Sequence, residues 1–223
     1  MIKHMKTVNQ FFTSIYKWMA AGVLLSAFSA YLTMQTSLVA ILQNPIIFYG
    51  IAAIEIGICL GLQWLIKRLS PQMAAMLYFV YAFLNGITLA GILAYYLSQS
   101  ASLVLVIFLV AASMFALLAF IGFTTKKDIS GWGIFLIASM WGVFFSSILN
   151  IFLQNSIFDT VISAVALVIF AGLTVYDNQF YKNYFAHLTT EEEKSKAVTI
   201  GALHMYINFI MIFQSLLRLV NSR

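Results

Sequence analysis

Five long stretches of this 223-residue chain contain no Asp, Glu, Lys or Arg: residues 18–54, 69–125, 129–158, 160–176 and 197–217. A helix needs about 20 apolar residues to cross a bilayer. Only 9% of the residues are charged and 62% are hydrophobic, whereas a soluble domain carries about 25% charged residues. A chain this poor in charge cannot cover a water-facing surface. The sequence therefore predicts an integral membrane protein whose exterior is solvated by lipid.

The neutral stretches have room for seven membrane-spanning helices. We expect these helices near residues 16–36, 46–66, 73–97, 102–123, 131–153, 157–181 and 197–219. The predicted fold class is an all-α, seven-transmembrane-helix bundle. Residues 1–15 are predicted to be a cytoplasmic N-terminal tail, and residues 16–223 a single transmembrane domain.

Polar residues near several span ends have the chemistry of helix caps. Asn44 and Ser70 each precede a proline, which suits the first position of a helix. Asp128 and Ser130 are predicted to cap the fifth span. The run Thr190–Glu193 matches a capping box, so a helix is expected to begin there and continue into the seventh span. Within the second span, Gly57 and Gly61 have the spacing that permits close helix contact.

Basic residues fall in alternate connections, which predicts the orientation of the chain. Ten of the twelve lie in the N-terminal region or after the second, fourth and sixth spans: Lys3, Lys6, Lys17, Lys67, Arg68, Lys126, Lys127, Lys182, Lys194 and Lys196. The positive-inside rule places that side, with the N-terminus, in the cytoplasm. The net charge of +5 is thus loop charge and does not indicate a nucleic-acid partner. Arg218 and Arg223 are exceptions, and we favour a seventh span that crosses and carries them outside.

Enzyme chemistry is not expected. Cys59 is the only cysteine, which excludes an intrachain disulfide and a cysteine metal site. Intramembrane aspartyl proteases need two membrane aspartates, so that one acts as base while the other is protonated. Asp177 has no such partner in the sequence, and Asp159 lies at the outer boundary. We expect no cofactor and no bound metal.

Glu55 is the most informative single residue. It lies eleven residues before Ile66, so it is roughly 17 Å from the end of its span and close to the bilayer midplane. A carboxyl group there must face the bundle interior, pair, or hold a proton. Two interpretations follow: an ion or proton site, or a neutral acid that is hydrogen-bonded to a neighbouring helix. We favour the first, because intramembrane ionisable residues usually serve function.

Asp177 lies near the cytoplasmic end of the sixth span, five residues before Lys182. It either caps or pairs at the interface, or it gates a pore at the inner mouth, and its position alone does not decide between these roles. Asn208 and Asn85 are buried amide candidates. Such amides most often join neighbouring membrane helices.

Four stretches together resemble the transmembrane Bax inhibitor motif family, and its bacterial members in particular. They are Asn85–Ile92, Thr124–Gly131, Leu173–Gln179 and Gly201–Ile210, the last followed by Leu216-Leu-Arg218. The resemblance covers essentially the whole chain. It implies a seven-helix bundle with the last helix at its centre, in the bacterial inner membrane. Bacterial members are linked to a pH-sensitive calcium leak and to modulation of a membrane AAA protease.

The resemblance also implies site residues. In the family, an Asp of span six faces a second Asp in span seven, and basic residues help to close the pore. Asp177 matches the first Asp, Glu55 matches an acidic residue of span two, and either Lys67 or Arg68 matches its basic end. Asn208 stands where the second Asp is expected. Two close carboxylates repel, so that one holds a proton, whereas Asp177 is free of that repulsion and can accept a hydrogen bond from Asn208.

The sequence is therefore compatible with two functions. The favoured one is a membrane cation leak, chiefly for calcium, with pH gating weakened by Asn208. The alternative is a non-conducting modulator of a membrane AAA protease that acts in membrane protein quality control. The lipid bilayer is a partner in both cases, calcium only in the first, and the protease only in the second.

Overall fold

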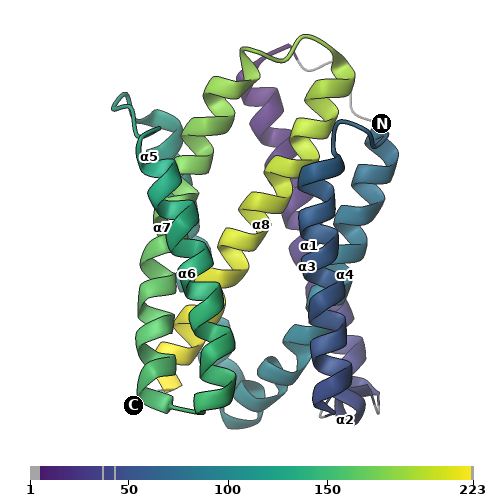
Figure 1. Cartoon of the computed structure of the whole chain (residues 1–223), viewed down its shortest axis with the longest axis vertical. Coiled ribbons are helices and arrows are strands. Elements are labelled where there is room, and N and C mark those ends of the chain that lie inside the picture. Colours follow the sequence, from purple (N-terminus) through teal and green to yellow (C-terminus); the bar gives the residue numbers. More distant parts are fainter. Residues whose placement is uncertain (1–5, 37, 43, 222–223) are drawn as a thin grey trace. The chain divides into compact units, whose positions relative to one another are not determined.

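The computed structural model describes residues 6–36, 38–42 and 44–221. In this part of the chain every regular element is a helix (Figure 1). The helices are α1 (Val8–Gln35), α2 (Leu38–Leu42), α3 (Pro45–Leu65), α4 (Pro71–Gln99), α5 (Ala101–Thr124), α6 (Trp132–Leu153), α7 (Ser156–Phe185) and α8 (Glu191–Asn221). All except α2 are long and apolar enough to cross a membrane. The all-helical, seven-span fold class is confirmed, while Lys3 and Arg223 lie outside the described residues.

Several helices extend beyond the apolar spans. α1 begins at Val8, inside the segment predicted to be a tail, because the Thr7 hydroxyl accepts a hydrogen bond from the Gln10 backbone nitrogen at 3.3 Å. α7 continues to Phe185, beyond the predicted end at residue 181. Hydropathy marks the part of a helix that lies in hydrocarbon, whereas caps and polar faces decide where the helix ends.

Two proline-linked caps are confirmed, and one predicted cap is wrong. The Asn44 and Ser70 side chains accept from the backbone nitrogens at the starts of α3 and α4. At α6 the cap position is Gly131, and no side chain bonds the helix end there. The Asp128 carboxylate instead accepts from the Ser130 hydroxyl at 2.6 Å and the Ser130 backbone nitrogen at 2.9 Å. These two hydrogen bonds lower the pKa of Asp128.

The capping box before the last helix is confirmed. The Thr190 hydroxyl accepts from the Glu193 backbone nitrogen at 3.1 Å, and Glu193 Oε2 accepts from the Thr190 backbone nitrogen at 3.0 Å. Each residue thereby satisfies a backbone donor of the other. Helix α8 begins at Glu191 directly after this box and runs on through the seventh apolar stretch.

The chain divides into two compact units, and α8 contributes to both. The first unit comprises residues 1–101 and 188–206 and contains α1 to α4 with the first part of α8. In it α4 packs against α1 and α3. Gly86 permits the close approach of α4 to α1, because a Cβ there would meet the backbone of Ser26.

The second unit comprises residues 102–187 and 207–223, so it contains almost all of α5, all of α6 and α7, and the last part of α8. α6 packs against α7, and Phe108 and Phe115 of α5 make edge-to-face contacts with Phe209 of α8. Gly122 of α5 lies against the backbone of Val175 in α7. The share of buried residues in the apolar segment of α8, yellow in Figure 1, is 67%, against 39% or less in the other spans.

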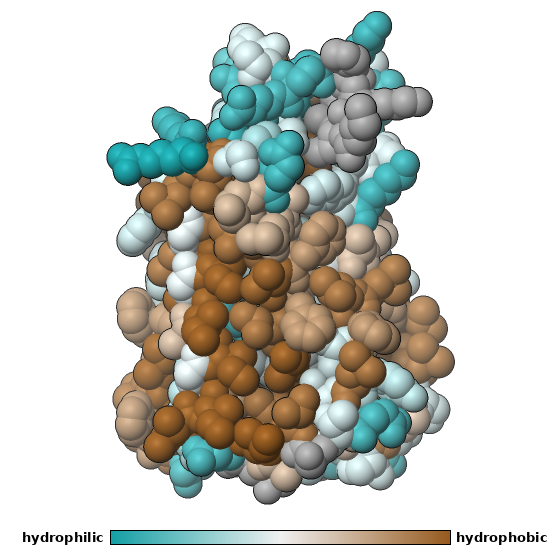
Figure 2. Space-filling view, turned by 90° about the vertical axis from the view of Figure 1, so that its right-hand side faces the viewer, coloured by the Kyte–Doolittle hydropathy of each residue, from teal (hydrophilic) through white to brown (hydrophobic). Residues whose placement is uncertain are grey.

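The close helix contact that the spacing of Gly57 and Gly61 permits is not formed, because a Cβ at either glycine would have no heavy atom within 4 Å. That face of α3 is open. Large apolar side chains are exposed on several helices, and hydrophobic residues cover much of the face drawn in Figure 2. Such a surface is stable in lipid, where exposing apolar side chains has no hydrophobic cost.

Candidate functional site

Glu55 is held in the interior of the first unit. It lies ten residues after Pro45, the first residue of α3, and it is one of two buried residues on that helix. Only 8% of the residue is exposed. The position therefore meets the condition that a carboxyl group near the middle of a span must face protein rather than lipid.

Two side chains on one face of α4 bind the Glu55 carboxyl group. The Asn85 amide donates to Oε2 at 3.0 Å, and the Thr88 hydroxyl donates to Oε1 at 3.0 Å. Asn85 and Thr88 are three residues apart, which places them on the same helix face. Both carboxyl oxygens thus have a neutral polar partner from a neighbouring helix.

A chain of hydrogen bonds continues from Asn85 to two further helices. The Tyr206 hydroxyl of α8 donates to Asn85 Oδ1 at 2.8 Å, and the same hydroxyl lies 2.6 Å from Ser26 Oγ of α1. Ser26 Oγ also lies 2.6 Å from the Ala82 carbonyl oxygen. We call Glu55, Asn85, Thr88, Tyr206 and Ser26 the Glu55 network. It joins α3, α4, α8 and α1 within the first unit.

Small residues give the network its shape. A Cβ on Gly22 would meet the rings of Tyr78 and Tyr206, so glycine makes room for both tyrosines beside α1. The Tyr78 hydroxyl donates to the Trp18 carbonyl oxygen at 2.9 Å. The rings of Tyr78 and Tyr206 meet edge to face, with centroids 6.2 Å apart. Aromatic packing of this kind fixes the position of the Tyr206 hydroxyl.

Asp177 and Asn208 meet in the second unit. Asn208 Nδ2 of α8 donates to Asp177 Oδ2 of α7 at 2.7 Å. Both residues are buried, with exposures of 7% for Asp177 and 3% for Asn208. The structure therefore forms the hydrogen bond that the sequence allowed between Asp177 and Asn208.

Lys67 and Arg68 do not reach Glu55. Both follow the end of α3 at Leu65 and are exposed, and they come twelve and thirteen residues after Glu55, roughly 18 Å along a helix axis. The Lys67 carbonyl oxygen accepts from Lys196 Nζ at 3.4 Å. Among the described residues of the first unit, the structure therefore brings Glu55 together with neutral partners and leaves both cations at the helix end.

The sequence did not predict the ion pair between Arg218 and Asp159. Arg218 Nη1 lies 3.1 Å from Asp159 Oδ1, and both side chains are partly exposed. Asp159 is in the first turn of α7, so the last turns of α8 lie beside the start of α7. The sequence did place both residues at the outer membrane boundary, and their opposite charges there could have indicated the pair.

Other members of the Glu55 network were also missed. Thr88, Tyr206 and Ser26 were not predicted, although Thr88 follows Asn85 at the spacing of one helix face. No group of three or more His, Cys, Asp or Glu that could hold a metal occurs in residues 6–36, 38–42 and 44–221, the part of the chain that the structure describes. Any cation at Glu55 would meet one carboxyl group with amide and hydroxyl oxygens.

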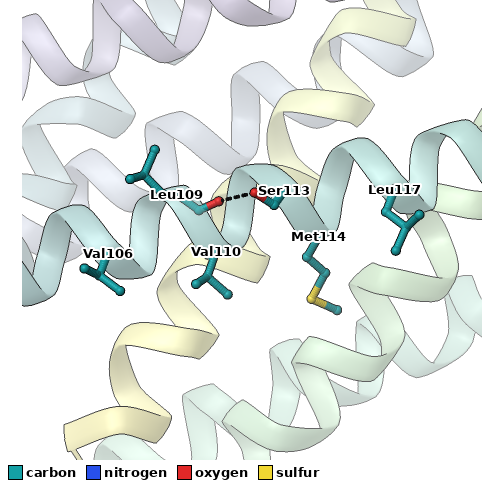
Figure 3. A pocket seen from close by; sticks show the side chains of 6 residues that line it. All are labelled: Val106, Leu109, Val110, Ser113, Met114 and Leu117. Carbon is teal, nitrogen blue, oxygen red and sulfur yellow. Dashed lines mark hydrogen bonds between the residues drawn. The ribbon is translucent and has the colours of Figure 1, made fainter.

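A separate hollow lies on α5 (Figure 3). It has a volume of about 490 Å³ and is lined by one face of that helix: Val106, Leu109, Val110, Ser113, Met114 and Leu117. The Ser113 hydroxyl donates to the Leu109 carbonyl oxygen at 2.8 Å within the helix. The other five residues that line the hollow are apolar, which suits contact with lipid chains.

The sequence profile of the protein family described as inhibitor of apoptosis-promoting Bax1 matches residues 8–223. The chain belongs to the Bax inhibitor-1 family. The inner membrane protein YbhL of Escherichia coli K12 is 30% identical over 97% of this chain and 93% of YbhL. A protein of Deinococcus radiodurans is 35% identical over 99% of this chain and 94% of the relative.

A membrane protein of Streptococcus pyogenes serotype M3 is 36% identical over 95% of this chain and 92% of that protein. These matches confirm the family that four sequence stretches had indicated. As a Bax inhibitor-1 family member, the chain is a multi-pass membrane protein similar to an inner membrane protein of Escherichia coli.

Proposed function

We propose that this protein is a cation leak pathway, chiefly for calcium, in a bacterial cytoplasmic membrane. The observation that carries the proposal is the buried carboxyl group of Glu55, which is held by the neutral side chains of Asn85 and Thr88. Removing a carboxyl group from water inside a membrane helix costs several kcal/mol. Ionisable residues that persist at such positions commonly mark ion or proton routes.

The oxygen chemistry of the two polar clusters supports calcium. Calcium takes carboxylate, carbonyl and other oxygen ligands. Glu55 with Asn85 and Thr88 presents a carboxyl group, an amide and a hydroxyl, and Asp177 with Asn208 presents a carboxyl group and an amide. One carboxyl group in each cluster suits weak, passing contact. Conduction requires that an ion leaves as readily as it enters.

The basic loops support the proposed orientation, with the N-terminus in the cytoplasm. In this orientation Lys67 and Arg68 lie at the cytoplasmic end of α3. Their charges repel cations that approach from that side, which restrains entry without blocking it. We propose that Asp177 gates the pore at its inner mouth. It lies near the cytoplasmic end of α7, eight residues before the last residue of that helix, Phe185.

Calcium flux into liposomes tests this function. The purified protein is reconstituted into vesicles that hold a calcium indicator, and the wild type is compared with Glu55→Gln. The glutamine keeps the shape of the side chain and cannot carry negative charge. We expect flux to fall at least about tenfold, equivalent to about 1.4 kcal/mol. Ser113→Ala is the matched control, because its hydroxyl bonds only within α5.

Wild-type flux equal to that of empty vesicles would overturn the leak proposal, and so would equal flux in the wild type and Glu55→Gln. A protein that does not conduct fits the second candidate, the modulator of a membrane AAA protease. Degradation of a membrane substrate by the protease, with and without this protein in the same vesicles, would then decide the matter.

A further inference from the structure

The Glu55 network contains four short polar contacts in series. They join the Ala82 carbonyl oxygen to Ser26 Oγ (2.6 Å), Ser26 Oγ to Tyr206 Oη (2.6 Å), Tyr206 Oη to the Asn85 amide (2.8 Å), and the amide to Glu55 Oε2 (3.0 Å). Two oxygen or nitrogen atoms at such distances attract only when a proton lies between them. The series therefore needs four protons, one for each contact.

The hydroxyl of Ser26, at one end of the series, determines which group supplies the proton for each contact. Ser26 has one hydroxyl proton, and the carbonyl oxygens of Ala82 and Gly22, at 2.6 and 3.0 Å, can only accept. Its proton is used there. The contact between Ser26 and Tyr206 must then use the phenol proton of Tyr206, which leaves Tyr206 without a proton for Asn85.

The contact between Tyr206 and Asn85 is then satisfied only if the amide NH₂ group faces Tyr206. An amide turned by 180° exchanges its oxygen and nitrogen and keeps both contacts in place. The Asn85 oxygen then faces Glu55 Oε2, and two oxygens 3.0 Å apart need a proton from the carboxyl group. With Glu55 ionised and the amide donating to it, only three of the four contacts have a proton.

We propose that Glu55 is a proton-binding site that is neutral at rest, and that loss of its proton rotates the Asn85 amide by 180°. Ser26, Tyr206 and Asn85 are the positioning residues that favour the bound proton, although Ser26 does not touch Glu55. Thr88 acts in the opposite direction. Its one hydroxyl proton is shared between Oε1 and the Asn85 carbonyl oxygen, each at 3.0 Å. Ionisation of Glu55 draws this proton to Oε1, because a hydrogen bond to a charged acceptor is stronger than one to a neutral acceptor.

Among the residues that the structure describes, the groups that interact with the carboxyl group do not supply a competing charge. The titratable side chains that interact with it are Tyr206 of α8 and Tyr81 of α4, and Cys59 lies one turn along α3 and interacts with Tyr81. Phenol and thiol groups are neutral at pH 7. The proton count thus depends on hydrogen bonds alone.

The consequence for the leak rests on the proposed function, whereas proton binding itself does not. A cation that reaches Glu55 displaces its proton, and the turned amide then offers a donor to the carboxylate. Because the proton is retained near neutral pH, this site adds no steep pH response there.

Infrared spectroscopy tests the proposal without any measurement of flux. The C=O stretch of a protonated carboxyl group is separate from the bands of a carboxylate. We expect the wild type at neutral pH to show such a band, and Glu55→Gln to lose it, which assigns it to Glu55. Absence of any band lost in Glu55→Gln would show that Glu55 is ionised and would overturn the proposal, whatever the flux result.

Substitutions in the network provide a second test, because they are expected to change the ratio of protonated to ionised Glu55 in opposite directions. At an alkaline pH where the wild-type band has lost half its intensity, Ser26→Ala and Tyr206→Phe should lower the ratio of protonated to ionised Glu55. Thr88→Val should raise it. Each change is expected to be about fivefold, which corresponds to one hydrogen bond of about 1 kcal/mol.

A loosened interior that admits water would move all three variants in the same direction, and that result would refute the proton count. An unchanged ratio in Ser26→Ala would refute it as well, because that residue acts only through Tyr206. Ser26→Ala removes a single oxygen atom, so it keeps the test open if Tyr206→Phe fails to fold.

Discussion

The two units each bury an acidic side chain on a membrane helix, and they treat it differently. In the first unit both oxygens of Glu55 have partners on α4, and one of these partners continues through Tyr206 to Ser26. In the second unit Asp177 accepts the Asn208 amide at 2.7 Å, which joins α7 directly to α8. The first arrangement is a series across four helices, and the second is a direct bond between two.

This difference indicates how each acid responds to a change elsewhere. A series of hydrogen bonds passes the effect of one group to the next, because every proton donated in one direction fixes the direction of its neighbour. Glu55 is therefore sensitive to Ser26, which it does not touch. At Asp177 the identity of residue 208 has the greatest influence, because an amide there supplies a donor and a carboxylate would supply a charge.

Removing the amide in each unit should have the largest effect on stability. Asn85→Leu leaves Glu55 Oε2 without its partner and removes one of the two partners of the Tyr206 hydroxyl, so it should lower the free energy of unfolding by about 2 kcal/mol. Asn208→Leu breaks one bond between helices and should cost about 1 kcal/mol, close to the upper range for polar contacts in membranes. Unfolding in the same detergent, at matched protein concentration, measures both. A larger loss in Asn208→Leu would reverse the ranking of the two units.

The second prediction turns the Asp177 contact into a pair of acids. In Asn208→Asp the two carboxyl groups share a proton at low pH and repel when both are charged. Repulsion at the contact between α7 and α8 should increase calcium leak as pH rises. We expect a change of about tenfold between pH 6 and pH 8 in the variant, about 1.4 kcal/mol. The wild type should change less than about threefold, since Asn208 does not titrate.

Flux in proteoliposomes at several pH values makes this measurement, and Asn208→Gln is a neutral control that alters side-chain length alone. A steep response in the wild type that persists unchanged in Asn208→Asp would contradict the prediction. It would place the pH sensor outside the Asp177 contact and make Glu55 the first residue to test.

The helices of this fold were largely predictable from sequence, because hydrocarbon permits few charges and the charged residues therefore mark the helix ends. The caps at Asn44 and Ser70 followed from local chemistry, since a side chain beside proline has few other roles. Asp128 failed as a cap because its carboxylate binds Ser130 instead. Gly57 and Gly61 had the spacing of a close contact, but spacing does not show which face of a helix meets a neighbour.

The candidate site was predictable only in part. Glu55 and Asp177 were singled out because a charge beside or within a neutral stretch is conspicuous, and the family resemblance allowed a contact between Asp177 and Asn208 without deciding it. Ser26, Thr88 and Tyr206 carry common side chains that membrane helices use for packing, so nothing in the sequence distinguishes them. Their role depends on which faces of α1, α4 and α8 meet, and that is set by tertiary packing at glycines such as Gly86 and Gly22.

The smallest effect is expected at the ion pair between Arg218 and Asp159. Its atoms are 3.1 Å apart, but the side chains are 35% and 40% exposed, so water screens the attraction. Arg218→Ala, Asp159→Ala and the double variant form a cycle that isolates the pair. We expect a coupling free energy below about 1 kcal/mol that falls further at high salt. A coupling above about 2 kcal/mol would mean that lipid or protein excludes water from this end of α7, and the second unit would then contain a buried charge pair of a kind that the Glu55 network lacks.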